Sequence, residues 1–163
     1  MKRWMTIGWT GVAAALVVAI LAPAGSTATV KKVAFTGNYS GTANVQVNGS
    51  VANISANGTG SGTTLGAGSI AGTGTGDSTA QPCVPFTGPG TMSGPGGKLI
   101  FTVPQGAQGC GDEAGQVFAV VGKANVTNGT GKLKKAHGIL KFTGTYDRGA
   151  GTFSVQFKGT LAQ

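Results

Sequence analysis

The chain has 163 residues, which is enough for one domain with one hydrophobic core, and it carries a formal net charge of +8 at pH 7. Charged residues make up only 10% of it, whereas glycine accounts for 31 residues. With 4 acidic residues and 1 histidine, the composition offers few groups for metal binding or acid–base catalysis.

The N-terminal 24 residues have the three parts of a secretory signal peptide. Lys2 and Arg3 form the positive start, residues 7–22 are mostly apolar, and Ala22-Pro23-Ala24 supplies the small residues of a cleavage site. We predict cleavage after Ala24, with cleavage after Ala28 as the near alternative. An uncleaved membrane anchor is the other interpretation, although the apolar run is shorter than the roughly 20 residues that a spanning helix needs.

The predicted mature protein, residues 25–163, differs in composition from the whole chain. Both tryptophans lie in the signal, and removing Lys2 and Arg3 leaves 10 basic against 4 acidic residues, a net charge of +6. Its two cysteines, Cys83 and Cys110, predict one disulfide, because exported proteins meet an oxidising environment. The alternative of a reactive thiol pair lacks the C-x-x-C spacing. We expect a secreted, extracellular protein.

The first element of the mature chain is a predicted hairpin. Residues 33–47 alternate apolar and polar side chains, which is typical of a strand with one buried face. Asn48-Gly49 predicts a type I′ turn that pairs Val47 with Ser50. In that register Ala52, Ile54, Ala56 and Gly58 share the apolar face of the first strand.

Further strands are predicted at residues 65–76, 85–92, 98–103 and 117–127, with the Gly- and Pro-rich residues 88–97 as the most flexible segment. A second hairpin joins residues 137–147 to 152–161 through a four-residue loop. It pairs Tyr146 with Phe153 and Phe142 with Phe157. About eight short strands without helical periodicity indicate an antiparallel sandwich or a closed barrel.

An eight-stranded barrel can enclose a packed core or one small ligand. A filled interior is our expectation, and a cavity is the alternative. If there is a cavity, the candidates for ligand contact are the aromatic residues in the inward phase of the outer hairpins: Phe35, Tyr39, Phe142, Tyr146, Phe153 and Phe157.

The titratable groups do not form a recognisable catalytic or metal-binding motif. His137 has no second histidine beside it, and the four acidic residues fall in predicted turns, so we predict no catalytic residues, no metal and no cofactor. The only cluster of charge is basic: Lys132, Lys134, Lys135 and Lys141. It is interpreted as a solvated turn or as a contact with an anionic envelope component, and nucleic acid is not expected because aromatic residues do not interleave it.

Residues 128–138, NGTGKLKKAHG, resemble a recurring segment of the allene oxide cyclase and dirigent barrels, which runs approximately G-G-T-G-[RK]-[FY]-x-x-A-x-G. Gly129, Thr130, Gly131, Lys132, Ala136 and Gly138 match it, while Asn128 and Leu133 depart from it. The resemblance implies an eight-stranded antiparallel up-and-down barrel, often trimeric, whose interior holds an apolar ligand. It places no family catalytic residue on this chain.

The sequence therefore predicts a signal peptide at residues 1–24 and an allene oxide cyclase-like barrel at residues 25–163. Its predicted function is non-catalytic binding of an apolar small molecule or an envelope component. A cyclase or stereo-directing enzyme of the dirigent type is the first alternative, and a structural or adhesive surface protein is the second.

Overall fold

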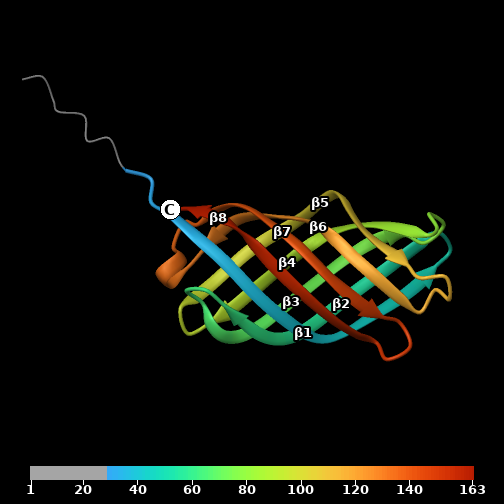
Figure 1. Cartoon of the computed structure of the whole chain (residues 1–163). Helices are drawn as coiled ribbons and strands as arrows, with labels where there is room; N and C mark the ends of the chain where they lie inside the picture. Colours follow the sequence, from blue (N-terminus) through green and yellow to red (C-terminus); the bar gives the residue numbers. More distant parts are fainter. Residues whose placement is uncertain (1–28) are drawn as a thin grey trace, which may run out of the picture.

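The computed structural model describes residues 29–163 and confirms the predicted eight-stranded antiparallel barrel. Each strand pairs with its neighbours in sequence, and β8 pairs with β1 to close the sheet (Figure 1). The predicted signal peptide and its cleavage sites lie outside the described residues. The strands are β1 (Lys32–Asn48), β2 (Val51–Gly62), β3 (Gly66–Asp77), β4 (Cys83–Gly94), β5 (Gly97–Gly111), β6 (Val117–Gly129), β7 (His137–Asp147) and β8 (Thr152–Ala162).

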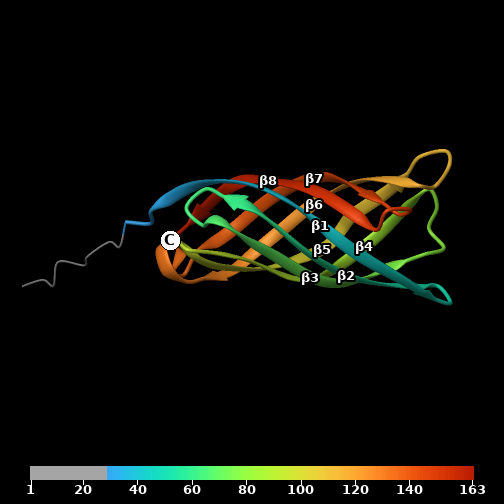
Figure 2. The ribbon, with the colours of Figure 1, turned by 90° about the horizontal axis from the view of Figure 1, so that it is seen from below.

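The barrel is long and its two ends differ (Figures 1 and 2). Both termini of the described chain lie at one end, where Lys31 and Gln163 exchange two backbone hydrogen bonds of 3.1 and 2.9 Å. This end also holds the turns at residues 63–65, 95–96 and 130–136, and it is called the closed end below. The opposite end, called the mouth, is formed by the loops at residues 49–50, 78–82, 112–116 and 148–151.

The first hairpin has the predicted faces but a different turn. Asn48 pairs with Val51, so the two turn residues are Gly49 and Ser50 rather than Asn48 and Gly49. Gly49 has a φ of +62°, whereas neither Asn48 nor Ser50 has a positive φ. A type II′ turn needs positive φ only at its first central residue, and this is where glycine stands. The pairing moves by two residues, which leaves every side chain on its predicted face.

The second hairpin has the predicted register, with Tyr146 opposite Phe153 and Phe142 opposite Phe157. The middle of the barrel differs more. β5 continues to Gly111, well beyond the predicted end at residue 103, and its pairing with β6 is interrupted between Thr102 and Gln108. Residues 88–94, predicted to be flexible, are part of β4.

Side chains alternate between the interior and the exterior, and the interior is apolar, whereas the outer faces of β5–β7 include the exposed Ile100, Val117, Val121 and Ile139. The outer faces of β8, β1, β2 and β3 carry mainly Ser, Thr, Asn and Gln, with contacts such as Gln156 Nε2 to Asn38 Oδ1 at 2.8 Å. Among residues 29–163, no helix is long and apolar enough to cross a membrane.

The closed end is tightly packed. Six large side chains there are almost completely buried: Leu65, Met92, Leu99, Leu133, Leu140 and Leu161. The connection between β6 and β7 folds inward as the 3₁₀ turn η1 (Gly131–Leu133), which places Leu133 in this core. Gly62 makes room for aromatic rings, because a Cβ there would lie 2.9 Å from both Phe35 Cζ and the Tyr39 hydroxyl oxygen.

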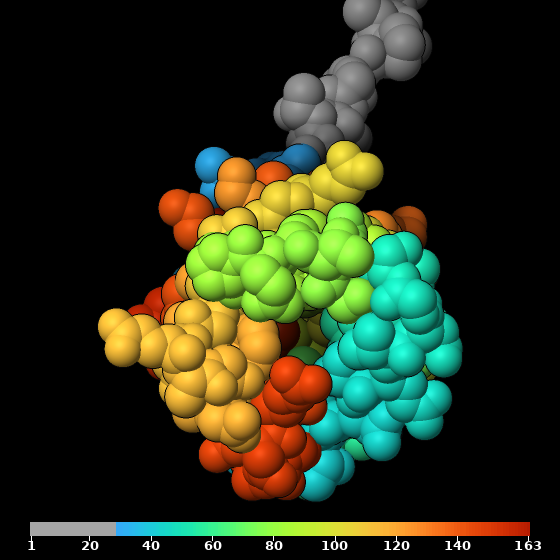
Figure 3. All heavy atoms as spheres, turned by 90° about the vertical axis from the view of Figure 1, so that its right-hand side faces the viewer, coloured from blue at the N-terminus to red at the C-terminus, as the bar shows by residue number. Residues whose placement is uncertain are grey.

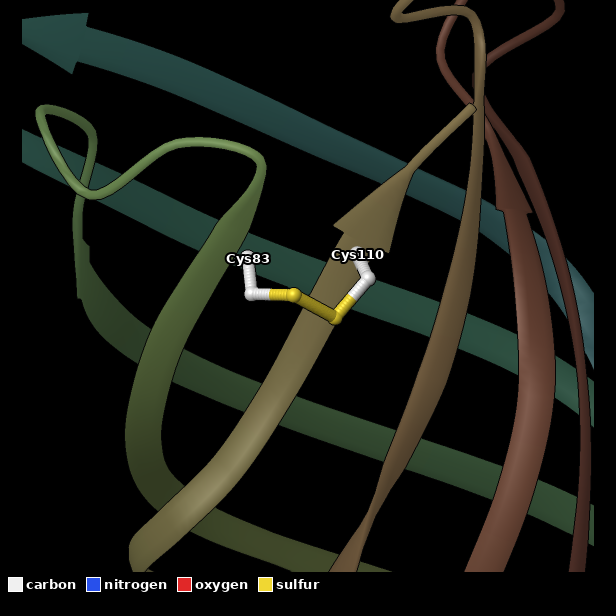
Figure 4. The surroundings of a disulfide bond; sticks show 2 residues. All are labelled: Cys83 and Cys110. Carbon is white, nitrogen blue, oxygen red and sulfur yellow. A yellow bond between two sulfur atoms is a disulfide. The ribbon is translucent and has the colours of Figure 1, made fainter. Parts of the chain in front are cut away.

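The predicted disulfide between Cys83 and Cys110 is present (Figure 4). It joins Cys83, the first residue of β4, to Cys110, the last residue but one of β5, and the two Cα atoms lie 3.9 Å apart. Val84 and Gly109 line the interior, so the alternating Cys83 and Cys110 side chains lie on the outer face. The bond thus holds two strands together near the mouth.

Tyr39 is a buried phenol in the closed half. Its side chain is 2% exposed, and its hydroxyl has no hydrogen-bond partner among the described residues. We expect Tyr39→Phe to raise the free energy of unfolding by about 1 kcal/mol, since an unsatisfied buried hydroxyl costs about 1–3 kcal/mol. Urea unfolding at pH 7 measures this, with Tyr146→Phe as the control, because the Tyr146 side chain is only half-buried. A destabilised Tyr39→Phe would contradict it.

The same residue predicts a pH effect. Burial raises the pKa of Tyr39 above its ordinary value of 10.0, because the charged phenolate is poorly solvated there. The folded state therefore favours the protonated form. The contribution of this phenol to the free energy of unfolding is fully present below pH 10.0 and is lost as the pH rises through the raised pKa. Between pH 9 and 12, the free energy of unfolding should fall less steeply with pH for Tyr39→Phe than for the unaltered protein.

Candidate functional site: a cavity in the mouth half of the barrel

The half of the barrel next to the mouth is hollow. A cavity of about 860 Å³ extends from the mouth into the interior. Seen from that end, the surface shows an opening ringed by the loops at residues 49–50, 78–82, 112–116 and 148–151 (Figure 3). Its volume lies within the range of about 300–1,000 Å³ usual for small-molecule sites. The interior is thus filled at one end and open at the other.

An aromatic cluster forms the floor of the cavity. Phe101, Phe142 and Phe157 are each 4–5% exposed, and their ring centroids lie 5.5 Å (Phe142 to Phe157) and 5.8 Å (Phe101 to Phe157) apart. Phe157 also packs edge-on against Tyr39, which is not part of the cavity lining. This cluster separates the cavity from the core of the closed end.

The walls of the cavity have opposite characters. β2 and β3 contribute mostly small side chains and bare backbone, such as Ala52, Ala56, Gly72 and Gly74, and in addition Ile54 and Ile70. In a closed barrel of eight consecutive strands, β3 faces β7 across the interior. The wall on that side is built from large groups on β6, β7 and β8: Phe118, Val120, Phe142, Tyr146, Phe153 and Val155. The small residues leave the space that the aromatic wall borders.

Several inward-facing apolar side chains are exposed within this space. Val45 and Val47 on β1 are in the same phase as buried Phe35, yet they are 38% and 54% exposed. Phe86, Phe153 and Val155 are also only partly buried. Covering apolar surface stabilises by about 25 cal/mol per Å², so an apolar molecule in the cavity would gain from these contacts.

Four of the six predicted ligand residues line the cavity: Phe142, Tyr146, Phe153 and Phe157. Phe35 and Tyr39 instead pack in the closed half, and neither reaches the lining. Phe86, Phe101 and Phe118 were not predicted. Each lies in an alternating apolar stretch of the sequence. The register shift at Phe86 and the interrupted pairing of β5, however, hide which face of these strands is continuous with the inner face of the two hairpins.

Titratable groups are scarce in the lining. Tyr146 and Arg148 are the only ones, and neither a carboxylate nor a lysine nor a histidine is present. His137 is exposed at the closed end, with Nδ1 3.2 Å from the Lys135 carbonyl oxygen. In residues 29–163, no three His, Cys, Asp or Glu side chains gather closely enough to hold a metal ion.

The charged residues of the barrel separate along its axis. The four acidic residues, Asp77, Asp112, Glu113 and Asp147, all lie at the mouth. The predicted cluster divides: Lys132, Lys134 and Lys135 are exposed in the turn at the closed end, together with Lys31, Lys32 and Lys98. Lys141 lies farther along the side, directly between Lys123 and Lys158 on the neighbouring strands.

The segment that resembles the allene oxide cyclase and dirigent barrels, residues 128–138, lies at the closed end. There Leu133 and Ala136 are fully buried and Gly131 has a φ of +62°. Comparison with protein-family models, with curated proteins and with solved structures found no significant match.

Proposed function

We propose that this protein is a secreted binding barrel that takes up an apolar small molecule through the mouth. The observation that supports this most is the cavity of about 860 Å³ whose lining is largely apolar. Val45 and Val47, which lie beyond the last pair between β1 and β8, add exposed apolar surface at the rim of the cavity. The disulfide at the mouth agrees with export, because such bonds persist in oxidising compartments.

Binding is favoured over the cyclase or dirigent alternative by the chemistry of the lining. Acid–base catalysis needs a positioned group that exchanges a proton near the operating pH. The cavity offers only Tyr146 and Arg148 for this purpose. The residues that carry the family resemblance, 128–138, build the closed end and do not contribute to the lining.

Gly72 provides a direct test of the cavity. It lines the cavity on β3, and a Cβ there would meet only Pro89 O at 3.4 Å and Gly90 Cα at 3.8 Å, so a larger side chain fits. We expect Gly72→Leu to weaken binding of the neutral fluorescent probe N-phenyl-1-naphthylamine at least about tenfold, because the leucine occupies apolar contact space worth about 1.5–3 kcal/mol. Fluorescence titration of the purified protein measures this.

The matched control is Thr75→Leu on the same strand, whose side chain lies on the outer face and is exposed. It should bind the probe like the unaltered protein. Failure of the unaltered protein to bind the probe would overturn the proposal, and so would equal binding by the two leucine variants. Native mass spectrometry of the protein from its own host then identifies any molecule that co-purifies.

A second candidate function, docking of the closed end on an anionic lipid surface, is supported by the separation of charge. The acidic residues lie at the mouth, whereas six lysines gather at the closed end. These lysines are Lys31, Lys32, Lys98, Lys132, Lys134 and Lys135. Basic residues near an anionic membrane contribute about 1 kcal/mol each. In this arrangement the mouth would point away from the surface.

The lysine test uses vesicles. Replacing Lys132, Lys134 and Lys135 together by glutamine should abolish co-sedimentation with vesicles of mixed phosphatidylcholine and phosphatidylglycerol at low salt. The control replaces Lys123, Lys141 and Lys158, which removes the same charge from the side of the barrel. Equal loss in both variants would show that net charge alone acts, and no binding by the unaltered protein would exclude the docking.

A further inference from the structure

Arg148 is the one charged side chain that lines the cavity. It is exposed at the start of the loop between β7 and β8, residues 148–151. The loop is held from both sides, because Arg148 N donates to Gln116 O at 2.8 Å and Ala43 N donates to Gly151 O at 2.8 Å. The backbone that carries the guanidinium therefore has a fixed place at the mouth.

The nearby carboxylates are engaged within their own turns. Asp147 Oδ1 accepts a hydrogen bond of 2.8 Å from Ala150 N, and Asp112 Oδ1 accepts one of 2.8 Å from Gln116 N. Asp77 accepts from both the backbone and the hydroxyl of Thr79, which lowers its pKa. None of the three belongs to the cavity lining, nor does Glu113. Arg148 is therefore the one charged group of the cavity lining, whereas the four carboxylates keep their negative charge at the rim around it.

The other polar groups of the lining near the mouth are neutral and include Asn44, Ser78 and Gln81. The rest of the lining, down to Phe101 and Phe157, is mainly aromatic, aliphatic or bare glycine backbone, and its further polar groups are the neutral hydroxyls of Thr73, Thr87, Thr145 and Ser154. A molecule that fits this gradient is apolar over most of its length and carries a single negative charge at its outer end. The planar guanidinium matches an oxyanion with two parallel N–H donors.

We propose that the ligand of this barrel is an apolar molecule with one oxyanion group, such as a carboxylate or sulfonate, which Arg148 binds at the mouth while the apolar part lies against the aromatic wall. This inference rests on the proposed function, since it specifies which class of apolar molecule the cavity takes. It assigns Arg148 as the residue that distinguishes an anionic ligand from a neutral one.

Two fluorescent probes with the same ring system test this assignment. N-Phenyl-1-naphthylamine is neutral, and 8-anilinonaphthalene-1-sulfonate adds one sulfonate to that skeleton. We expect Arg148→Gln to weaken binding of the sulfonate about tenfold, since a charge-assisted hydrogen bond is worth about twice a neutral one, and to change binding of the neutral probe less than about twofold. In the unaltered protein, the preference for the sulfonate over the neutral probe should also shrink with added salt, because Arg148 is exposed.

The control variant is Lys123→Gln, which removes the same charge from the outer face of β6. It should leave the affinities for both probes unchanged. Equal affinity of the sulfonate for the unaltered protein and Arg148→Gln would overturn the assignment, as would an equal loss in Lys123→Gln. If instead the unaltered protein binds neither probe, the proposed function itself fails, so the two failures are distinct.

Discussion

Replacing Phe157 by alanine should lower the free energy of unfolding by about 3–5 kcal/mol, the largest effect we expect from a single substitution in this protein. Phe157 is 4% exposed and stands where the two halves of the barrel meet. Its ring lies 5.5 to 6.3 Å from those of Phe142, Phe101 and Tyr39, measured between centroids. Its removal deletes these contacts and extends the cavity toward the closed end, where β-strand backbones prevent collapse.

Urea unfolding followed by far-ultraviolet circular dichroism measures this loss. Phe153→Ala is the matched control, because Phe153 lies on the same strand and faces the same cavity but is only partly buried. We expect Phe153→Ala to lower the free energy of unfolding by less than about 2 kcal/mol, because folding removes less apolar surface of Phe153 from water. Equal losses for the two variants would contradict the role of Phe157 as the floor of the cavity.

Removing the disulfide should cost about 3.5 kcal/mol in the chain-entropy model, for a bond between residues 27 positions apart. The effect should also be local. The bond clamps β4 to β5 near the mouth, where the pairing of these two strands shifts between Phe86 and Gly88 and the pairing of β5 with β6 is interrupted between Thr102 and Gln108. Amide exchange should therefore accelerate first at residues 83–87 and 107–111 in the variant Cys83→Ser with Cys110→Ser.

A reducing agent provides the control for this prediction. Dithiothreitol should lower the stability of the unaltered protein to that of the double serine variant and leave the variant itself unchanged. Exchange at the closed end, around Leu133 and Leu140, should change only with global stability. A double variant as stable as the oxidised protein would show that the strand pairing at the mouth does not need the bond.

The strands were predictable because their alternation is regular and because, in each of two hairpins, the paired strands could be checked for a shared apolar face. The second hairpin has the predicted register, as Tyr146 opposite Phe153 shows. The first was wrong in its turn, since Asn48-Gly49 favours one turn type while Gly49 at the first central position permits another. A shift of two residues keeps both faces, so apolar periodicity could not detect it.

The extent of β5 and the cavity could not be predicted from the same pattern. Pro104 and Gly106 disrupt the alternation, and the strand continues beyond them because both β4 and β6 pair with residues 108–110. Whether the interior is filled depends on which residues face each other across the closed barrel. Small groups on β3 oppose aromatic groups on β7 near the mouth, whereas Leu133 enters the core only at the closed end.

The two backbone hydrogen bonds between Lys31 and Gln163 make the ends of the folded chain immediate neighbours. A short peptide linker could therefore join them into a ring without disturbing β1 or β8. New ends could then be opened within residues 112–116 or 148–151, one loop at a time, which would report how each rim segment governs ligand entry. A tag or support attached next to Lys31 or Gln163 would leave the mouth facing outward, so that uptake could be measured on the immobilised protein.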